Sequence, residues 1–270
     1  MITDVKYHIL AIFSLVRIGF VKLQIYRLSA SIKILSSILL VVLQYYLWSA
    51  IYESNPDLEY TFNQMFLYLL LSQVIFTIFP SGISSQIAQL VQNGDIIHKL
   101  LKPYGILKQF FFESIGSCIF SICYIGIPIV VVSLVFFDFQ ITELEYRRII
   151  YFFEMLLFSY LFVFEFEAII GLCSFYTLNA WGLQSFKYAI ITLFSGRFLP
   201  LYLYPDYIKK IVEILPFKMM FFLPLDYLLN DNIRNASDII SYQIFWVLII
   251  FLLMIALVKV TQKKVLIQGG

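Results

Sequence analysis

The segment Gln86–Pro103, QIAQLVQNGDIIHKLLKP, decides how the whole chain is interpreted. It lies between two long apolar stretches, yet it carries too many polar residues to cross a bilayer itself. Apolar residues still recur every three to four positions, which is typical of one face of a helix; they are Ile87, Leu90, Val91, Ile97 and Leu101. The pattern predicts a short amphipathic helix held against a membrane, where a soluble partner can reach it.

The composition indicates a membrane protein. Of the 270 residues, 61% are hydrophobic and 13% are charged, whereas soluble proteins carry about 25% charged residues. The 28 Phe and 19 Tyr fit lipid-facing helices with aromatic residues at the interfaces. A net charge of +2 is too small to indicate a nucleic-acid partner. The three Cys and two His residues show no metal-binding or disulfide spacing, so we expect no metal site.

Six stretches are long and apolar enough to cross a bilayer, which takes about 20 helical residues. They are Ile32–Tyr52, Phe62–Ile83, Phe110–Phe137, Ile149–Tyr176, Tyr188–Tyr204 and Tyr242–Val260. The fifth is interrupted by Gly196, Arg197 and Pro200. Residues 1–30 form a basic segment broken by Arg17, which favours a helix in the membrane interface. A seventh span is the alternative for this segment.

Basic residues set the orientation of the chain. Lys and Arg gather before the first span, between the second and third, and after the last, which predicts that these segments and both termini are cytoplasmic. Three prolines in residues 205–240 predict short helices at the outer surface, either a lid that dips back or a packed cap. No repeat or linker divides the chain. We therefore predict one domain, residues 1–270, with an all-α integral membrane fold of six transmembrane helices.

Chemistry-bearing motifs are scarce. No nucleotide-binding loop, nucleophile elbow or zinc-protease motif occurs, so we expect no catalytic residue and no cofactor bound by this chain. The fourth stretch contains Glu154, Glu165 and Glu167; helical periodicity places the first two on one face and Glu167 nearly opposite. Because a charge inside a membrane is costly, these carboxylates either line a substrate pathway or form ion pairs with Lys187, Arg197 or a partner subunit.

Four local patterns resemble the permease subunits of type-2 ABC exporters, in the branch whose ATPase is a separate chain. They are NGDIIHKLLKPYG (Asn93–Gly105), SGRFLPL (Ser195–Leu201), ILPF (Ile214–Phe217) and the terminal IQGG. They occur in the family's order over nearly the full length of the chain. The resemblance implies a plasma-membrane permease of bacterial type that exports a lipophilic or amphipathic cargo, such as a drug, a peptide or a lipid-linked molecule.

The resemblance also implies partners and residue roles. Two ABC ATPase subunits holding ATP and magnesium would dock on the cytoplasmic face, and a second permease, identical or different, would pair with this chain within membrane lipid. Coupling to the ATPase would fall to Asp95, Ile97, His98, Lys99, Leu100, Leu101 and Lys102 on a helix spanning about Gln86–Leu101. A gating motif would comprise Ser195, Gly196, Arg197 and Pro200.

Two other functions stay open from the residues alone. A proton-coupled secondary transporter would use Glu165 or Glu167 as a proton relay, and it usually shows an inverted repeat, which is not evident here. A non-transporting accessory or immunity protein would bind a ligand without moving it, and it would not need the segment Gln86–Pro103.

Overall fold

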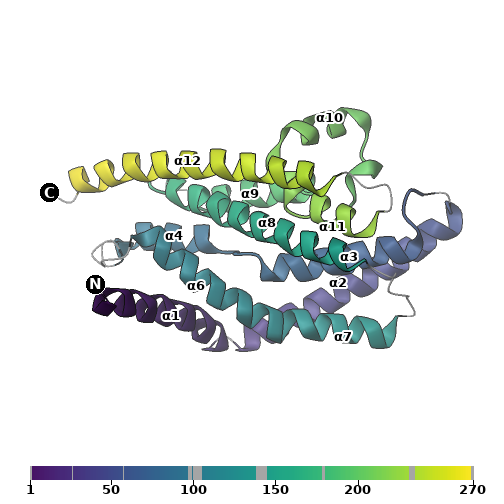
Figure 1. Ribbon diagram of the computed structural model, residues 1–270, viewed down its shortest axis with the longest axis horizontal. Helices are drawn as coiled ribbons and strands as arrows, with labels where there is room; N and C mark the ends of the chain where they lie inside the picture. The colour runs from purple at the N-terminus through teal and green to yellow at the C-terminus, as the bar shows by residue number, and fades with distance from the viewer. Residues whose placement is uncertain are drawn as a thin grey trace.

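The computed structural model describes residues 2–25, 27–56, 58–96, 99, 105–137, 145–177, 180–230 and 235–268. Within these residues the chain is helical with short connections and contains no strand, which confirms the predicted all-α class. The long helices run lengthwise through the molecule (Figure 1). The α-helices are α1 (Ile2–Ile25), α2 (Arg27–Ser54), α3 (Phe62–Ile78), α4 (Ile83–Gln92), α6 (Ile106–Ser121), α7 (Ile127–Phe136), α8 (Tyr146–Cys173), α9 (Ala180–Phe194), α10 (Asp206–Ile214), α11 (Phe222–Leu229) and α12 (Ala236–Gln268).

Six helical stretches in the described part of the chain are long and apolar enough to cross a membrane: Tyr7–Ile25, Leu28–Ser54, Phe62–Gln92, Ile106–Phe136, Tyr146–Cys173 and Ala236–Gln262. Their number agrees with the prediction, but two members differ. The N-terminal segment qualifies because its apolar residues outweigh Arg17 and Lys22. The predicted fifth span does not, since α9 ends at Phe194 and the chain turns before Pro200.

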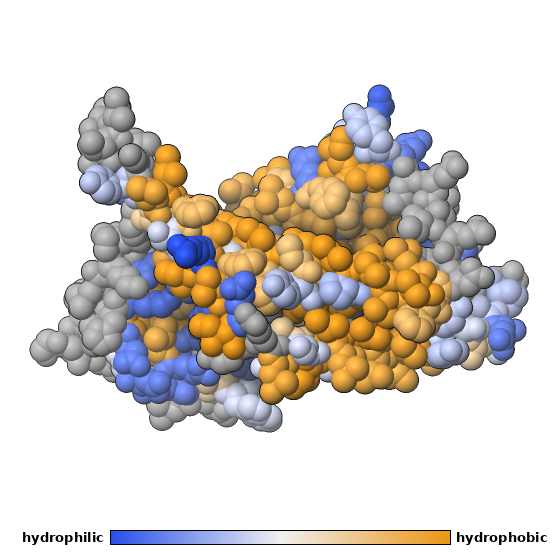
Figure 2. All heavy atoms as spheres, turned by 90° about the horizontal axis from the view of Figure 1, so that it is seen from below, coloured by the Kyte–Doolittle hydropathy of each residue, from blue (hydrophilic) through white to orange (hydrophobic). Residues whose placement is uncertain are grey.

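The surface agrees with a lipid environment. Figure 2 shows a broad apolar band across the middle of the described surface on that side, with hydrophilic residues gathered toward both ends of the longest axis. The exposed faces of α1 and α2 are rich in large apolar side chains, including Phe13, Ile18, Leu39 and Leu43. Because lipid tails solvate such side chains, these faces need no protein cover.

Helices α1 and α6 touch through their backbones. A Cβ atom on Gly19 would lie 1.8 Å from the carbonyl oxygen of Glu113, and one on Gly116 would lie 1.9 Å from the carbonyl oxygen of Val16. Beside this crossing, Ser117 Oγ donates a hydrogen bond to the Gly19 carbonyl oxygen at 3.3 Å. The two glycines therefore allow an approach that any side chain would prevent, as small residues do in membrane helix pairs.

The candidate span Phe62–Gln92 is broken into two helices, α3 and α4. Helix α3 ends because Pro80 forces the preceding residue, Phe79, into an extended conformation. Gly82 then adopts a φ of 82°, which only glycine takes without strain, and α4 starts at the next residue. Helix α4 itself ends at Gln92, and Gly94 turns the chain with a φ of 77°.

The predicted coupling helix therefore needs correction. The described helix starts at Ile83 and stops at Gln92, instead of running from Gln86 to Leu101, because the Asn93–Gly94 turn interrupts the periodic apolar stripe. Among the residues given a coupling role, Ile97, His98, Leu100, Leu101 and Lys102 lie outside the described residues.

Helices α6 and α7 are joined by a π-helical turn, Ile122–Gly126. A π turn accommodates one more residue than an α-helical turn. Along this stretch the buried side chains recur every four residues, at Ser121, Ile125, Ile129 and Ser133.

The prolines in residues 205–240 produce the short helices that the sequence predicts: α10, a 3-10 turn at Pro216–Met219, and α11. Helix α11 is almost wholly buried and belongs to the main apolar core with residues of α3 and α8. Tyr60 Oη donates a hydrogen bond to Asp226 Oδ1 at 2.5 Å, and Gln64 Nε2 donates one to the Leu229 carbonyl oxygen at 2.9 Å. This part of the segment thus packs into the bundle and is not a loose cover.

Candidate functional site

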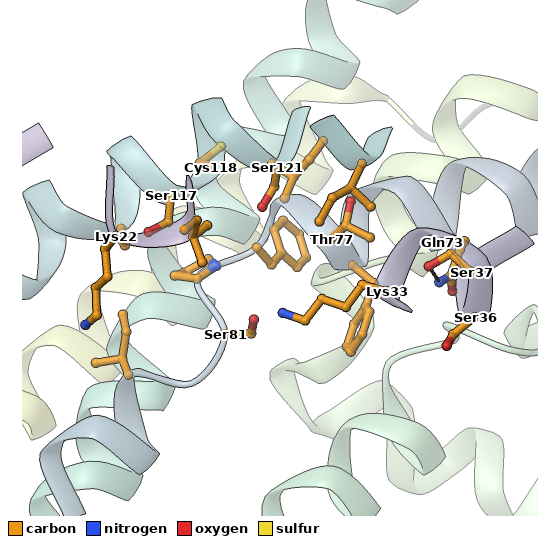
Figure 3. Close-up of a pocket in the computed structure, with 18 of the residues that line it drawn as sticks. Lys22, Lys33, Ser36, Ser37, Gln73, Thr77, Ser81, Ser117, Cys118 and Ser121 are labelled. Atoms are coloured by element: carbon orange, nitrogen blue, oxygen red, sulfur yellow. Dashed lines mark hydrogen bonds between the residues drawn. The ribbon is translucent and has the colours of Figure 1, made fainter. Parts of the chain in front are cut away.

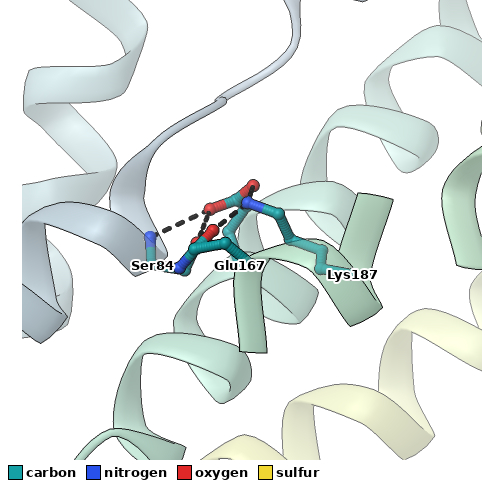
Figure 4. A network of polar contacts seen from close by, with 4 residues as sticks. Ser84, Glu167 and Lys187 are labelled. Atoms are coloured by element: carbon teal, nitrogen blue, oxygen red, sulfur yellow. Dashed lines mark hydrogen bonds and ion pairs between the residues drawn. The ribbon is translucent and has the colours of Figure 1, made fainter. Parts of the chain in front are cut away.

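Three segments meet at a buried polar network formed by Ser84 of α4, Glu167 of α8 and Lys187 of α9 (Figure 4). Lys187 Nζ lies 2.6 Å from Glu167 Oε1 and donates a hydrogen bond to Ser84 Oγ at 2.9 Å. Glu167 Oε2 accepts hydrogen bonds from the Ser84 backbone N–H at 2.9 Å and from Ser84 Oγ at 2.6 Å. The Lys187 and Glu167 side chains are only 1% and 4% exposed. Each charge is therefore paired away from solvent.

The start of α4 explains why the carboxylate lies there. Backbone N–H groups in the first turn of a helix have no partner within the helix, and the helix dipole favours a negative charge beside them. Ser84 is the second residue of α4, so its N–H is one of these free donors. One turn along α8 from Glu167, Gly171 lets Ile87 pack closely, since a Cβ atom there would lie 2.7 Å from Ile87 Cδ1. Helix α4 is thus seated on α8 at two successive points.

The three glutamates of α8 do not form one site. Glu167 pairs with Lys187, which is one of the alternatives that the sequence offers. Glu165 is 5% exposed, and its Oε2 atom has no hydrogen-bond partner among the described residues. Glu154 is exposed. Although Glu154 and Glu165 share a helix face, packing separates their surroundings.

The proposed gating motif forms the break after α9. Ser195 Oγ donates a hydrogen bond to the Ile191 carbonyl oxygen at 2.5 Å, and Gly196 turns the chain with a φ of 77°. Helix α3 holds this turn, because Tyr68 Oη donates to the Gly196 carbonyl oxygen at 2.6 Å and Ser72 Oγ donates to the Arg197 carbonyl oxygen at 2.8 Å. The break is therefore an ordered structure fixed by a neighbouring span.

Among the described residues, the Arg197 guanidinium contacts an amide and an aromatic ring but no carboxylate. Arg197 Nη2 donates a hydrogen bond to Gln73 Oε1 at 3.0 Å, and its Cζ atom lies 3.2 Å from the centroid of the Phe76 ring. Gln73 Nε2 in turn donates to Ser37 Oγ of α2 at 2.9 Å. Buried Pro200 precedes the 3-10 turn Leu201–Leu203. Gly196 and Arg197 thus lie against α3, and the chain of contacts continues through Gln73 into α2.

No role was predicted from the sequence for the polar residues of α3. Tyr68, Ser72 and Gln73 lie four and five positions apart, so they share one side of an otherwise apolar helix. Such a polar stripe in a span indicates contact with another polar segment, and it could have been found from spacing alone. Ser84 carried no such signal, because its role depends on where α4 begins.

Of the coupling residues, the structure describes Asp95 and Lys99. Asp95 is exposed in the turn that follows α4. Lys99 Nζ forms an ion pair with Glu113 Oε1 at 2.9 Å and lies 4.1 Å from the centroid of the Phe110 ring, so α6 holds this side chain. Asp95 is therefore the described coupling residue most accessible to a partner.

An apolar bundle with broken spans and buried ionic contacts between them is a multi-pass protein of the cell membrane. The chain belongs to the ABC-2 transporter family, because the family model described as ABC-2 family transporter protein matches residues 38–268. It is thus a permease subunit of an ABC transporter, as the four sequence patterns predict. The family forms the membrane component of transporters that work with ATPase partners. Neither the comparison with curated proteins nor that with solved structures found a match.

Substituting Gly196 with alanine should destabilise the folded protein at the turn that follows α9. The added Cβ atom would meet Phe222 Cβ at 2.8 Å and Tyr68 Oη at 3.1 Å, in addition to backbone strain at a φ of 77°. Gly94→Ala is a matched control, since Gly94 has the same φ and no atom within 4 Å of its Cβ position. We expect the control to lose about 1–2 kcal/mol of stability from backbone strain alone, and Gly196→Ala to lose more. Thermal unfolding in detergent measures both, and equal losses would contradict the contact.

Proposed function

We propose that this permease subunit is driven by ATP hydrolysis on two separate ATPase subunits, which bind ATP and magnesium, and that α4 receives their motion. The observation that carries the proposal is the buried Ser84–Glu167–Lys187 network, which ties the first turn of α4 to α8 and α9. A helix fixed to two neighbouring helices by hydrogen bonds to buried charged side chains transmits a displacement as a rigid body. A partner that pushes on α4 would therefore move the bundle.

In this proposal the motion of α4 passes through α9 to the turn that follows α9. Lys187 lies within α9, the helix that ends directly before Ser195–Arg197, and α3 holds that turn through Tyr68 and Ser72. A shift of α9 would thus act directly on the turn. In this proposal the motif residues gate the pathway, because their carbonyl oxygens and the Arg197 guanidinium keep their contacts only in one arrangement of α9 and α3.

The arrangement of the ends supports the placement of the ATPase. Figure 1 shows the start of α1, the end of α12 and α4 at one end of the molecule, and the connection between α2 and α3 at the other. Exposed Glu53 lies at the end of α2 and exposed Glu59 in the connection, while basic residues gather in the segment after α4. By the positive-inside rule the α4 end is cytoplasmic.

The proposed cargo is lipophilic or amphipathic and leaves the cell. A second permease, identical or different, would pair with this chain, and access would alternate between the two sides of the membrane at their interface. The aromatic-rich, apolar spans support a cargo that enters from the lipid phase. The direction, outward, is the one that the sequence resemblance implies.

Glu165 favours a second candidate function, proton-coupled transport. The Glu165 side chain, which projects from α8, is buried, and its Oε2 atom lacks a hydrogen-bond partner in the described part of the chain. Intramembrane carboxylates of this kind serve as proton relays in secondary transporters. Glu167 is a weaker candidate because both of its oxygens are occupied.

Co-purification of the native protein with its ATPase tests the proposal. We expect an ATP-binding partner to accompany the wild type and Asp95→Lys to reduce its recovery about tenfold, because the charge reversal falls on the proposed docking surface. Glu53→Lys is the matched control, since it is an equally exposed acidic residue at the opposite end. Transport that proceeds without any ATP-binding partner, follows a pH gradient and is abolished by Glu165→Gln would instead establish the proton-coupled alternative.

A further inference from the structure

A cavity of about 430 Å³ opens between the end of α1, the start of α2, the α3–α4 connection and α6 (Figure 3). Its size falls within the range of small-molecule sites, roughly 300–1,000 Å³. Hydroxyl groups from several segments line it, among them Ser81 and Ser121, alongside apolar side chains such as Ile32 and Phe76. The cavity thus combines hydrogen-bond donors with a wall that suits a hydrocarbon chain.

The charged side chains of the cavity are mainly basic. Lys22, Lys33 and Arg197 line it, whereas Glu113 is the one acidic residue among the described lining residues. Glu113 already forms an ion pair with Lys99, which comes from the segment after α4. Glu113 also lies near enough to Lys22 to attract it electrostatically, but one carboxylate shared with Lys99 cannot balance all three basic residues that face the cavity.

None of the three basic groups has a carboxylate partner within the described residues. Lys22 Nζ donates a hydrogen bond to Gln86 Oε1 at 2.6 Å, and Arg197 Nη2 donates one to Gln73 Oε1 at 3.0 Å; both acceptors are neutral amides. Lys33 forms no hydrogen bond or ion pair in the described part of the chain. Figure 3 shows the Lys33 amine directed toward Ser81 in the middle of the cavity.

We propose that this cavity binds the anionic headgroup of a membrane amphiphile, a phosphate or similar oxyanion carried on acyl chains. Ammonium, guanidinium and hydroxyl donors converge there, and an oxyanion accepts hydrogen bonds from all three. A neutral headgroup would leave the lysines without a counter-ion, and a cationic one would be repelled. The apolar wall and the exposed flanks of α1 and α2 give the acyl chains a place beside the headgroup.

Native mass spectrometry of the delipidated protein tests this site. The probes are phosphatidylglycerol, phosphatidylcholine with the same acyl chains, and inorganic phosphate. We expect phosphatidylglycerol to bind about tenfold more tightly than phosphatidylcholine, and Lys33→Gln to remove about that factor, as loss of one hydrogen bond to a charged group does. Lys33→Arg should keep the preference, as should Lys259→Gln, which alters an exposed lysine of α12 outside the cavity.

Equal binding of the two lipids, or an unchanged preference in both Lys33→Gln and Lys22→Gln, would overturn the proposal. Inorganic phosphate that binds as tightly as phosphatidylglycerol would overturn the amphiphile as the source of the anion. Melting temperatures establish that each variant is folded. No nucleotide or ATPase is present in this experiment, so its outcome is separate from that of the ATPase co-purification.

Discussion

Adding a single methyl group at Gly19 or Gly116 is expected to destabilise the protein by about 3 kcal/mol, the upper part of the range for overpacked sites. The added carbon would lie 1.8 Å from the Glu113 carbonyl oxygen in one case and 1.9 Å from the Val16 carbonyl oxygen in the other. Both obstacles are backbone atoms and cannot rotate away. Helices α1 and α6 must therefore move apart, which loses their packing along the whole crossing.

The measurement is thermal unfolding of Gly19→Ala and Gly116→Ala in detergent. Gly105→Ala is the control, because Gly105 has a negative φ and no atom within 4 Å of its Cβ position. We expect the control to melt like the wild type. If all three variants melted alike, the backbone contact between α1 and α6 would not exist in the folded protein.

Breaking the Glu167–Lys187 pair from either side is expected to cost about 3–5 kcal/mol, because the remaining charge is left buried without its partner. Glu167→Gln leaves the Lys187 ammonium without an anion, and Lys187→Met leaves the carboxylate with only Ser84. The double variant removes both charges, so it should recover most of the stability. The loss in the double variant is therefore expected to be much smaller than the sum of the two single losses.

A double-mutant cycle of unfolding free energies checks this result, with Glu154→Gln as a control on the exposed side of the same helix. Strictly additive losses would mean that the two charges do not interact. The double variant also addresses the proposed function. If α4 transmits motion through this pair, the folded double variant should move less cargo per ATP hydrolysed than the wild type.

The membrane class and most of the helices could be predicted because apolar length is a local property of the sequence. The choice of spans could not be settled in this way. The predicted fifth span is apolar enough in composition, but α3 stabilises a turn at Ser195–Arg197 through contacts that no local pattern reveals. The N-terminal segment is also long and apolar enough to cross a membrane, so length and composition do not distinguish a span from a helix in the membrane interface there.

The candidate site was predicted in part. The cost of a buried charge favours a partner for Glu167, and Lys187 is one of the partners that the sequence offers. The contribution of Ser84 could not be foreseen, because it rests on the helix break at Pro80–Gly82 and on the packing of α4 against α8. The close approach of Gly19 to Glu113 and of Gly116 to Val16 was not predicted from the sequence either. Each glycine is unremarkable within its own helix, and only the pairing of the two helices makes them necessary.

The π turn at Ile122–Gly126 bears on how insertions and deletions affect this protein. Three α-helical turns take about 10.8 residues, whereas the buried positions Ser121 and Ser133 are separated by 12 positions and three intervals. The surplus is about one residue, and the π turn, which accommodates one more residue than an α-helical turn, lies within this stretch. A chain one residue shorter within this turn could therefore close α6 and α7 into an uninterrupted helix with both inward faces preserved. Elsewhere in the spans, the same deletion would rotate everything beyond it by about 100°.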